Sequence, residues 1–500
     1  MSYTEYQLLT QKAADFNNAA AVLSWDQETY MPPKGFALRG RQLATLATAA
    51  HEITTSSRYA RLLQDLSQDA SLTEEQRINV IRSYEDYQKQ SKLSPDFVEA
   101  LSLQTNLCFE AWIQARKNND FSVFEAPLQK MINLKRKEAN LYGYEGHPYN
   151  ALLDEYEKGA TVTLLDGVFR DLKAALSPIF RKISAVPQVG NAVFKGDFEK
   201  EKQFRFTETI LRAMGYDFDA GRQDYSEHPF SISFGPEDAR ITTRADEKDL
   251  SFMLWSSIHE GGHALYEQGL PSAQYGLPLG AACSLSIHES QSRLWENCVG
   301  RSEAFWEAFY PSLQAKFPEK LESFSMADFF RAANRVAPSF IRTEADELTY
   351  HFHVMIRYEI EKEIFSGKLA AKDLPETWNA AYEKYLGITP PDAKQGVLQD
   401  VHWAHGSFGY FPTYTLGSLY AAQFYEQALK DIPNLEAQFA GGDFASLLAW
   451  LRKHIHQYGR RFTSEELCER VTGSGLKSDA FIRYLQNKMA QVYPAAFAQS

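Results

Sequence analysis

Cysteine is scarce in this chain. Only four occur in 500 residues, and no two of them form a C-x-x-C pair. Small secreted domains that depend on disulfides carry many more cysteines at short spacings. We therefore interpret all four as reduced, mostly buried thiols and expect a cytoplasmic protein. They are Cys108, Cys283, Cys298 and Cys468.

Long apolar runs and basic runs are also missing. No apolar run approaches the ~18 residues that span a bilayer, so we predict no membrane segment. The N-terminal segment lacks a basic stretch followed by an apolar core, and we expect no secretion signal. The formal net charge is −12 without any Lys/Arg-rich run, which argues against a nucleic-acid partner. A composition of 44% hydrophobic and 23% charged residues is typical of a globular protein with a large core.

Helical signals run through most of the sequence. Capping-box patterns begin at Thr73 and Thr463, and Ser94-Pro95 is a typical helix start. No repeat, low-complexity stretch or clear linker interrupts the chain, so we predict a mainly α fold with a single large domain over residues 1–500. Helical segments are expected in residues 1–145, from 285 to about 300, and at 326–334, 343–365 and 375–386.

One short region predicts β-structure. Residues 230–234 alternate polar and apolar side chains, Gly235-Pro236 favours a turn, and residues 240–243 can return as a second strand. The hairpin comes directly before the helix described next. Two interpretations stay open: its exposed edge holds an extended peptide, or it only covers the core.

Residues 248–270 contain the spacing H-E-x-x-H, formed by His259, Glu260 and His263. In a helix the two imidazoles lie about 40° apart around the axis, so both face one way. Neutral imidazoles are good Zn²⁺ ligands, and the carboxylate between them can act as a base. Gly261 and Gly262 each cost roughly 1 kcal/mol in a helix interior. We therefore expect another segment to approach the backbone closely at this point.

A catalytic zinc generally has three protein ligands and an open position. Glu289 is the best candidate for the third, because it follows His263 by 26 residues and has Arg293 four positions on. Glu267 and Glu296 stay as alternatives. The same helix also contains the E-x-x-H pattern of di-iron bundles, but those need two such pairs and no second one is found.

Six motifs in a fixed order make the sequence resemble the carboxypeptidase Taq family of metallocarboxypeptidases (peptidase family M32). The loop WDQETYMPP near Trp25 is also similar, so the resemblance covers most of the chain. One segment departs from it: HPYNALLDEYEKG begins with His147, where the family more often has Asn-Pro-Tyr-Asp. The motifs are His228-Pro229-Phe230, Asp238-Ala239-Arg240-Ile241-Thr242, His259-Glu260-Gly261-Gly262-His263, His288-Glu289-Ser290-Gln291, Ile341-Arg342-Thr343-Glu344-Ala345-Asp346 and Gly396-Val397-Leu398-Gln399-Asp400-Val401-His402-Trp403.

The resemblance implies a function and a site. His259, His263 and Glu289 would bind Zn²⁺, which Co²⁺ can often replace, and Glu260 would assist attack by a zinc-bound water. The implied activity is release of single C-terminal residues from peptides, with broad specificity and little action on C-terminal proline. The implied structure is helical with a deep active-site cleft, usually as a homodimer.

Other residues have less certain roles. His402, Tyr410 and Tyr414 are candidate donors to the oxyanion. Arg342 is our first choice for binding the substrate's terminal carboxylate, because a guanidinium can pair with both oxygens. Arg240 is a second choice.

The alternatives for these residues are structural. Arg240 can brace the hairpin through Asp238, and Arg342 can form an ion pair with Glu344 or Asp346. Asp346 and Asp400 are expected to support other polar side chains. Rival functions are an oligopeptidase, a dipeptidyl carboxypeptidase, or a peptide-binding scaffold without catalysis; the intact Glu260 argues against the last.

Overall fold

The computed structural model describes residues 2–498, and the chain folds into two compact units. Unit 1 combines Met1–Ser91, Gly190–Ala333 and Tyr420–Leu476. Unit 2 combines Lys92–Val189, Asn334–Leu419 and Lys477–Ser500. Among residues 2–498 no helix is both long and apolar enough to cross a bilayer.

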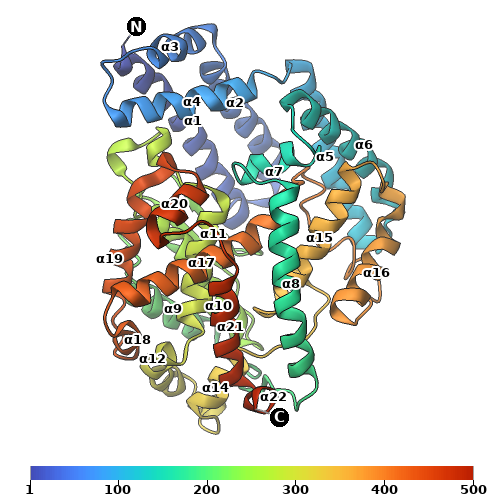
Figure 1. Cartoon of the computed structure of the whole chain (residues 1–500), viewed down its shortest axis with the longest axis vertical. Helices are drawn as coiled ribbons and strands as arrows, with labels where there is room; N and C mark the ends of the chain where they lie inside the picture. The colour runs from blue at the N-terminus through green and yellow to red at the C-terminus, as the bar shows by residue number, and fades with distance from the viewer. Residues whose placement is uncertain (1, 499–500) are drawn as a thin grey trace. The chain divides into compact units, whose positions relative to one another are not determined.

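The predicted mainly α fold is confirmed: the described residues form 22 α-helices and one small sheet (Figure 1). Helix α17 (Pro412–Asp431) begins in unit 2 and continues into unit 1. The other α-helices of unit 1 are α1 (Tyr3–Thr29), α2 (Phe36–Thr54), α3 (Ser57–Ser67), α4 (Glu74–Gln90), α9 (Lys200–Met214), α10 (Leu250–Glu267), α11 (Leu285–Arg293), α12 (Glu303–Lys316), α13 (Pro318–Leu321), α14 (Met326–Ala333), α18 (Leu435–Ala440), α19 (Ala445–His454) and α20 (Ser464–Thr472).

Unit 2 holds the remaining α-helices, and short 3₁₀ turns occur in both units. The helices are α5 (Pro95–Asn118), α6 (Ser122–Tyr142), α7 (Asn150–Tyr156), α8 (Val162–Ser184), α15 (Tyr350–Phe365), α16 (Leu374–Leu386), α21 (Asp479–Val492) and α22 (Pro494–Phe497). The 3₁₀ turns are η1 (Pro33–Gly35), η2 (Ala192–Phe194), η3 (Ser272–Gln274), η4 (Pro278–Gly280), η6 (Arg342–Glu344), η7 (Ala371–Asp373) and η8 (His456–Arg461).

Side-chain caps define several of the helix starts. Both predicted capping boxes form, at Thr73 and Thr463, and the side chain of Ser94 caps α5. The helix expected at 343–365 begins only at Tyr350, because the carboxylate of Asp346 accepts the backbone N–H groups just before it. After α11 the chain continues as a π-helix, η5 (Leu294–Gly300), which the sequence did not predict.

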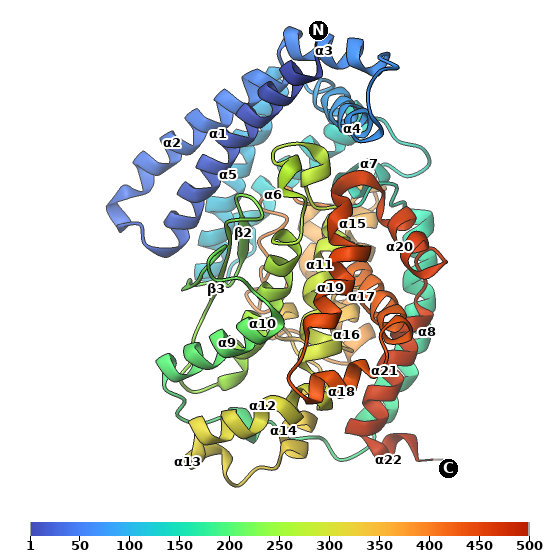
Figure 2. The same ribbon diagram turned by 90° about the vertical axis from the view of Figure 1, so that its left-hand side faces the viewer.

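The small sheet lies in unit 1 and has the strand order β1-β3-β2. The predicted hairpin is confirmed as β2 (Ser231–Ser233) antiparallel to β3 (Ala239–Thr243). A third strand, β1 (Gln223–Tyr225), pairs with β3 in parallel and was not predicted. Strand β2 therefore forms one edge of the sheet, and Figure 2 shows the hairpin near α10.

Helix α10 is the centre of unit 1. Met253, Ile258 and Leu265 are completely buried. The expected close approach occurs at Gly262, where a Cβ would lie 2.6 Å from the Cα of Ser292, so only glycine lets α11 come this near. The late segment of unit 1 covers the same region, because Nε2 of His456 lies 3.0 Å from Oε1 of Gln291.

The N-terminal helices form a separate small core within unit 1. Helices α1 and α2 run side by side as an antiparallel pair (Figure 2). Tyr6, Tyr59, Leu63 and Val80 from α1, α3 and α4 pack with Leu277 from the loop that follows α10. This packing places the N-terminal helices against the loop 275–282.

Candidate active site

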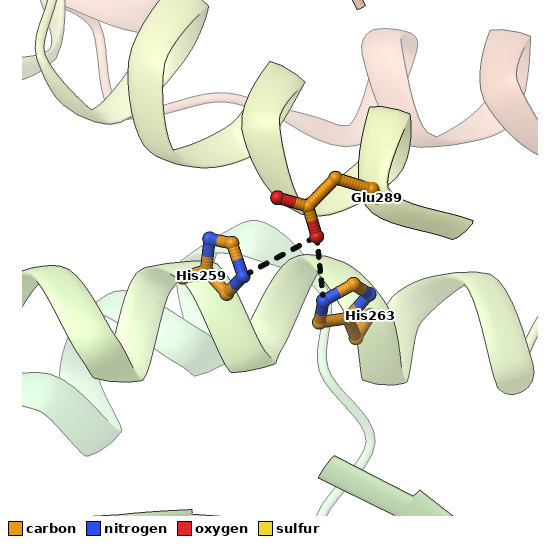
Figure 3. Close-up of side chains that lie close together, drawn as sticks. All are labelled: His259, His263 and Glu289. Atoms are coloured by element: carbon orange, nitrogen blue, oxygen red, sulfur yellow. Dashed lines mark ion pairs between the residues drawn. The ribbon is translucent and has the colours of Figure 1, made fainter. Parts of the chain in front are cut away.

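Three potential metal ligands converge in unit 1. Helix α10 presents His259 and His263 on one face, as its four-residue spacing predicts, and α11 presents Glu289. Oε2 of Glu289 lies 3.8 Å from Nε2 of His259 and 3.5 Å from Nε2 of His263 (Figure 3). The three donor atoms all lie within 4.8 Å of one another. Tetrahedral Zn²⁺ with ligand bonds near 2.1 Å places ligand atoms about 3.4 Å apart, so the arrangement fits such an ion.

The outer atoms of two of these residues are held by other side chains. Nδ1 of His259 lies 2.9 Å from Oε2 of Glu296, on the π-helix. Nε of Arg293 donates to Oε1 of Glu289 over 2.7 Å. Because Glu296 accepts the Nδ1 proton of His259, the lone pair of that ring remains on Nε2, which faces the common centre.

His263 is oriented through a second imidazole. Its Nδ1 lies 2.6 Å from Nδ1 of His288, whose Nε2 lies 2.7 Å from Oε1 of Glu267. A carboxylate can only accept hydrogen bonds, so Nε2–H of His288 donates a hydrogen bond to Glu267. The unprotonated Nδ1 of His288 then accepts a hydrogen bond from Nδ1–H of His263. The Nε2 lone pair of His263 is thereby left toward the centre.

The charges around the centre favour a cation. Burial raises the pKa of Glu289, but Arg293 and His259 lower it more, to well below its usual range. Burial lowers the pKa of His263 to about 4, so this ring is neutral near pH 7 and can donate a lone pair. Burial also opposes charge on His259, yet Glu289 and Glu296 raise its pKa. An ionised carboxylate beside imidazole lone pairs is a good site for a divalent ion.

Glu260 lies between the two histidines on α10 and is nearly buried. Burial raises the pKa of its carboxyl, His259 lowers it and Glu289 raises it, and together these effects bring the pKa to about 7. Ser231, on the edge strand β2, lies near this carboxyl and lowers its pKa slightly. A group that titrates near neutral pH can both take up and release a proton in one reaction cycle.

The structure distinguishes between the three glutamates that the sequence offered as the third metal ligand. Glu289 joins the two histidines, whereas Glu267 contacts His288 and Glu296 contacts His259. The sequence missed these two supporting roles and that of His288. The motif His288-Glu289 was the feature of the sequence that could have indicated a role for His288. Only the folded chain shows that this ring contacts His263. Nη2 of Arg301 donates to Oε1 of Glu296 over 3.0 Å. The name histidine–glutamate cluster is used below for His259, His263, His288, Glu260, Glu267, Glu289, Glu296, Arg293 and Arg301.

A second buried polar cluster lies in unit 2. Nε and Nη2 of Arg342 donate to Oδ1 of Asp400 over 3.1 and 2.9 Å, and its Nη1 donates to the hydroxyl of Tyr350. Arg357 donates to Oδ2 of the same Asp400 over 2.7 Å. The structural alternative for Arg342 therefore named the wrong partner, because the arginine pairs with Asp400 and not with Glu344 or Asp346. We call Arg342, Arg357 and Asp400 the arginine cluster.

The candidate oxyanion donors lie together beside the arginine cluster. Nε2 of His402 is 3.1 Å from the hydroxyl of Tyr414, and the ring of Tyr410 lies 5.2 Å from that of His402. Arg342 lies over the ring of Tyr414, 4.7 Å from its centre. Burial lowers the pKa of His402 to about 3, so the imidazole is neutral.

Glu361, on α15, fixes the segment that joins these donors. It accepts hydrogen bonds from Nε1 of Trp403 and the backbone N–H of Gly409, over 2.7 and 2.8 Å, and from the hydroxyl of Tyr149. Burial nevertheless raises the pKa of Glu361 to about 7. Sequence inspection did not identify this residue, because its partners are remote along the chain.

Arg240 braces the hairpin, as the structural alternative predicted. Its Nε and Nη2 each donate to a different oxygen of Asp238 over 2.7 Å. The guanidinium also lies over the rings of Trp25 and Phe234, 4.5 and 4.9 Å from their centres. The WDQETYMPP segment therefore contacts the sheet through Trp25.

Known proteins resemble this chain over nearly its whole length. The carboxypeptidase Taq (M32) metallopeptidase family matches residues 5–489. Carboxypeptidase 1 of Bacillus subtilis is 39% identical over 491 residues, which cover 98% of each chain. Thermostable carboxypeptidase 1 of Thermus thermophilus is 40% identical and covers 97% of each chain.

A solved structure agrees with these relatives. The crystal structure of an M32 carboxypeptidase from Deinococcus radiodurans is 40% identical to this chain and superposes with a TM-score of 0.96. The alignment covers 98% of this chain and 99% of the other. Family, relatives and fold agree with the motifs in the sequence, and the convergent His, His and Glu suit a metal-dependent hydrolase. The chain therefore belongs to the carboxypeptidase Taq (M32) family of metallopeptidases and is a metallocarboxypeptidase, a hydrolase of peptide bonds.

Proposed function

We propose that this enzyme uses one Zn²⁺ ion to release single residues from the C-termini of peptides, with broad specificity and little action on C-terminal proline. Co²⁺ can take the place of Zn²⁺. The observation that supports the metal best is the pair of distances, 3.5 and 3.8 Å, between one oxygen of Glu289 and Nε2 of each histidine. Outer hydrogen bonds hold all three side chains in these positions.

In this proposal His259, His263 and Glu289 hold the ion. When bound, it supplies Lewis acidity toward a water molecule and the scissile carbonyl. Glu260 takes the proton of the attacking water and returns it to the leaving amine. Its pKa of about 7 suits both transfers, and Ser231 lies near the carboxyl.

The arginine cluster and its neighbours would act on the substrate. Arg342 binds the terminal carboxylate, and the neutral His402 with Tyr410 and Tyr414 supplies hydrogen bonds to the developing oxyanion. Arg240 is the second candidate for the carboxylate, although two of its N–H groups already donate to Asp238.

We further propose that the 500 residues form one metallopeptidase domain that works as a homodimer in the cytoplasm. The four free cysteines agree with a reducing compartment. One cooperative unfolding transition would support the single domain, and two transitions would contradict it. Light scattering behind size exclusion would distinguish a dimer from a monomer.

Metal analysis combined with mass spectrometry of the products tests the activity. A peptide with free termini should lose one C-terminal residue at a time, and degradation should stop before proline. The purified protein should contain one equivalent of zinc. Release of dipeptides would indicate a dipeptidyl carboxypeptidase, and internal cleavage an oligopeptidase. Either pattern would contradict the proposal.

A further inference from the structure

A cavity of about 400 Å³ lies in unit 1, beyond the C-terminal end of α10. The N-terminal helices α1 to α4 form one wall, and the loop 275–282 forms another. The end of β2 and the turn after it, residues 233–236, close a third side together with Glu267. Its volume is in the range of ligand pockets, which is about 300–1,000 Å³.

The cavity is connected to the histidine–glutamate cluster by two residues of its lining. Glu267 accepts from His288, which in turn contacts His263. Strand β2 packs against α10. Ser233, at the end of β2, lies near Glu267, and Ser231, at the other end of the same strand, lies near Glu260. Strand β2 therefore follows α10 from the proposed base to the cavity.

The length of this path can be expressed in peptide residues. Glu267 follows Glu260 by seven positions, which corresponds to about 10 Å along a helix. An extended peptide advances about 3.3–3.6 Å per residue, so roughly three residues fit between the reacting carbonyl and the cavity. Because β2 is an edge strand, its outer side can hold such a peptide by main-chain hydrogen bonds.

The reaction also limits what can occupy the cavity. A carboxypeptidase has only one substrate residue on the C-terminal side of the scissile bond. All other residues extend to the opposite side, which needs the longer binding surface. A path of roughly three residues that ends in a cavity matches that longer side.

The lining favours one kind of side chain. Tyr59, Tyr87, Phe234 and Tyr275 contribute aromatic rings. The charged lining residues are Asp86, Glu267 and Arg460, so carboxylates outnumber the guanidinium. Asp86 accepts both hydrogen bonds of Arg460, over 2.8 and 3.0 Å, which leaves the guanidinium engaged. Aromatic side chains can stack here, whereas an acidic side chain meets like charge.

We propose that this cavity is the subsite for the third residue before the scissile bond, and that it accepts an aromatic side chain and disfavours an acidic one. The assignment rests on the carboxypeptidase function proposed above. It makes substrate length and the identity of that residue determinants of efficiency.

Wild-type enzyme can test the assignment without any mutation. Acetylated tetrapeptides that differ only at the third residue before the scissile bond would carry Phe, Ala or Asp. We expect kcat/KM to be about tenfold higher for Phe than for Asp, mainly through KM. Equal values for the three peptides would overturn the assignment.

Filling the cavity gives a second test. Gln90 ends α4, is exposed and lines the cavity, so Gln90→Trp should occupy its volume. Gln88→Trp on the same helix is the matched control, because this residue does not line the cavity. The ratio of kcat/KM for the Phe tetrapeptide to that for an acetylated dipeptide should fall about tenfold in Gln90→Trp and stay unchanged in Gln88→Trp.

The outcomes separate this inference from the proposed function. If wild type releases no single C-terminal residue from either peptide, the carboxypeptidase proposal fails. If wild type is active but Gln90→Trp lowers kcat/KM equally for both substrates, or for neither, only the subsite assignment is overturned. A changed preference for the C-terminal residue itself would place the cavity on the other side of the scissile bond and would also overturn it.

Discussion

The histidine–glutamate cluster and the arginine cluster are both at least partly buried, and the numbers of their acidic and basic side chains are unequal in opposite senses. In unit 1 four carboxyl groups, those of Glu260, Glu267, Glu289 and Glu296, surround the histidines with only two guanidinium groups, Arg293 and Arg301. In unit 2 two guanidinium groups share the single carboxylate of Asp400. Buried charge without a partner is costly, so such imbalances are unusual unless a ligand completes them.

Each imbalance suits a different partner in the proposed reaction. The carboxyl and imidazole acceptors that converge in unit 1 suit the divalent metal that we propose there. The guanidinium groups of unit 2 suit the terminal carboxylate of a peptide, which we propose that Arg342 binds.

The largest effect is expected in the histidine–glutamate cluster. Glu260→Gln keeps the shape of the side chain but cannot take up a proton. Turnover should fall about 10²–10⁴-fold while metal content and peptide binding are retained. Steady-state kinetics on protein of known zinc content would measure this. Near-normal turnover in the zinc-replete variant would remove Glu260 from the mechanism.

Loss of one of the three proposed ligands should weaken the binding of the metal. Glu289→Ala removes the oxygen that faces both imidazoles, and it also removes the carboxylate that Arg293 contacts over 2.7 Å. Removing only a supporting partner of a ligand already costs about 10–100-fold in metal affinity, so the loss here should be at least that large. Competition with a zinc-binding dye measures it. Full zinc occupancy in this variant would show that Glu289 is not a ligand.

A substitution in the arginine cluster should change the efficiency on particular substrates and leave metal binding unchanged. Arg342→Ala should lower kcat/KM for free-acid peptides about 10- to 100-fold, with a much smaller loss on the matching C-terminal amides. The reason is that only the acid offers an anion to the guanidinium. Equal losses on acid and amide, with zinc intact, would mean that Arg342 only stabilises Asp400 and Tyr350.

The smallest effect concerns stability in unit 2. Burial raises the pKa of Glu361 to about 7 in the folded chain, above its ordinary value of 4.5. A raised carboxyl pKa stabilises the fold fully below about pH 4.5, and this contribution is lost as the pH rises through about 7. The Tm of wild type should therefore fall more steeply over this range than that of Glu361→Gln. Parallel curves from calorimetry at several pH values would contradict a raised pKa for Glu361.

Sequence reasoning identified the elements with local signals. The four-residue spacing of His259 and His263 predicts their common face, and Gly262 in the middle of a helical pattern indicates the close approach of another segment. The capping motifs at Thr73 and Thr463 predicted two helix starts, and the alternation of residues 230–234 predicted a strand. Each of these features depends on residues within one turn or one hairpin, which explains why local chemistry was enough.

Features that depend on distant partners could not be predicted. Asp400 lies 58 positions from Arg342, so the sequence favoured the nearer Glu344 and Asp346 instead. Strand β1 has only three residues and no strict alternation, and it forms because β3 lies beside it. The hydrogen bond between His259 and Glu296 could not be predicted either. Glu296 lies on the π-helix, where side chains point in other directions than on an α-helix.

The discontinuity of unit 1 has a consequence during synthesis. The histidine–glutamate cluster is complete in sequence at Arg301, but the segment Tyr420–Leu476 that covers α11 through His456 emerges 175 residues later (476 − 301). Ribosomes add about 5–20 residues per second, so this interval lasts about 10–35 s. Until His456 emerges late in this interval, α11 lacks the contact that it makes with this segment in the folded chain.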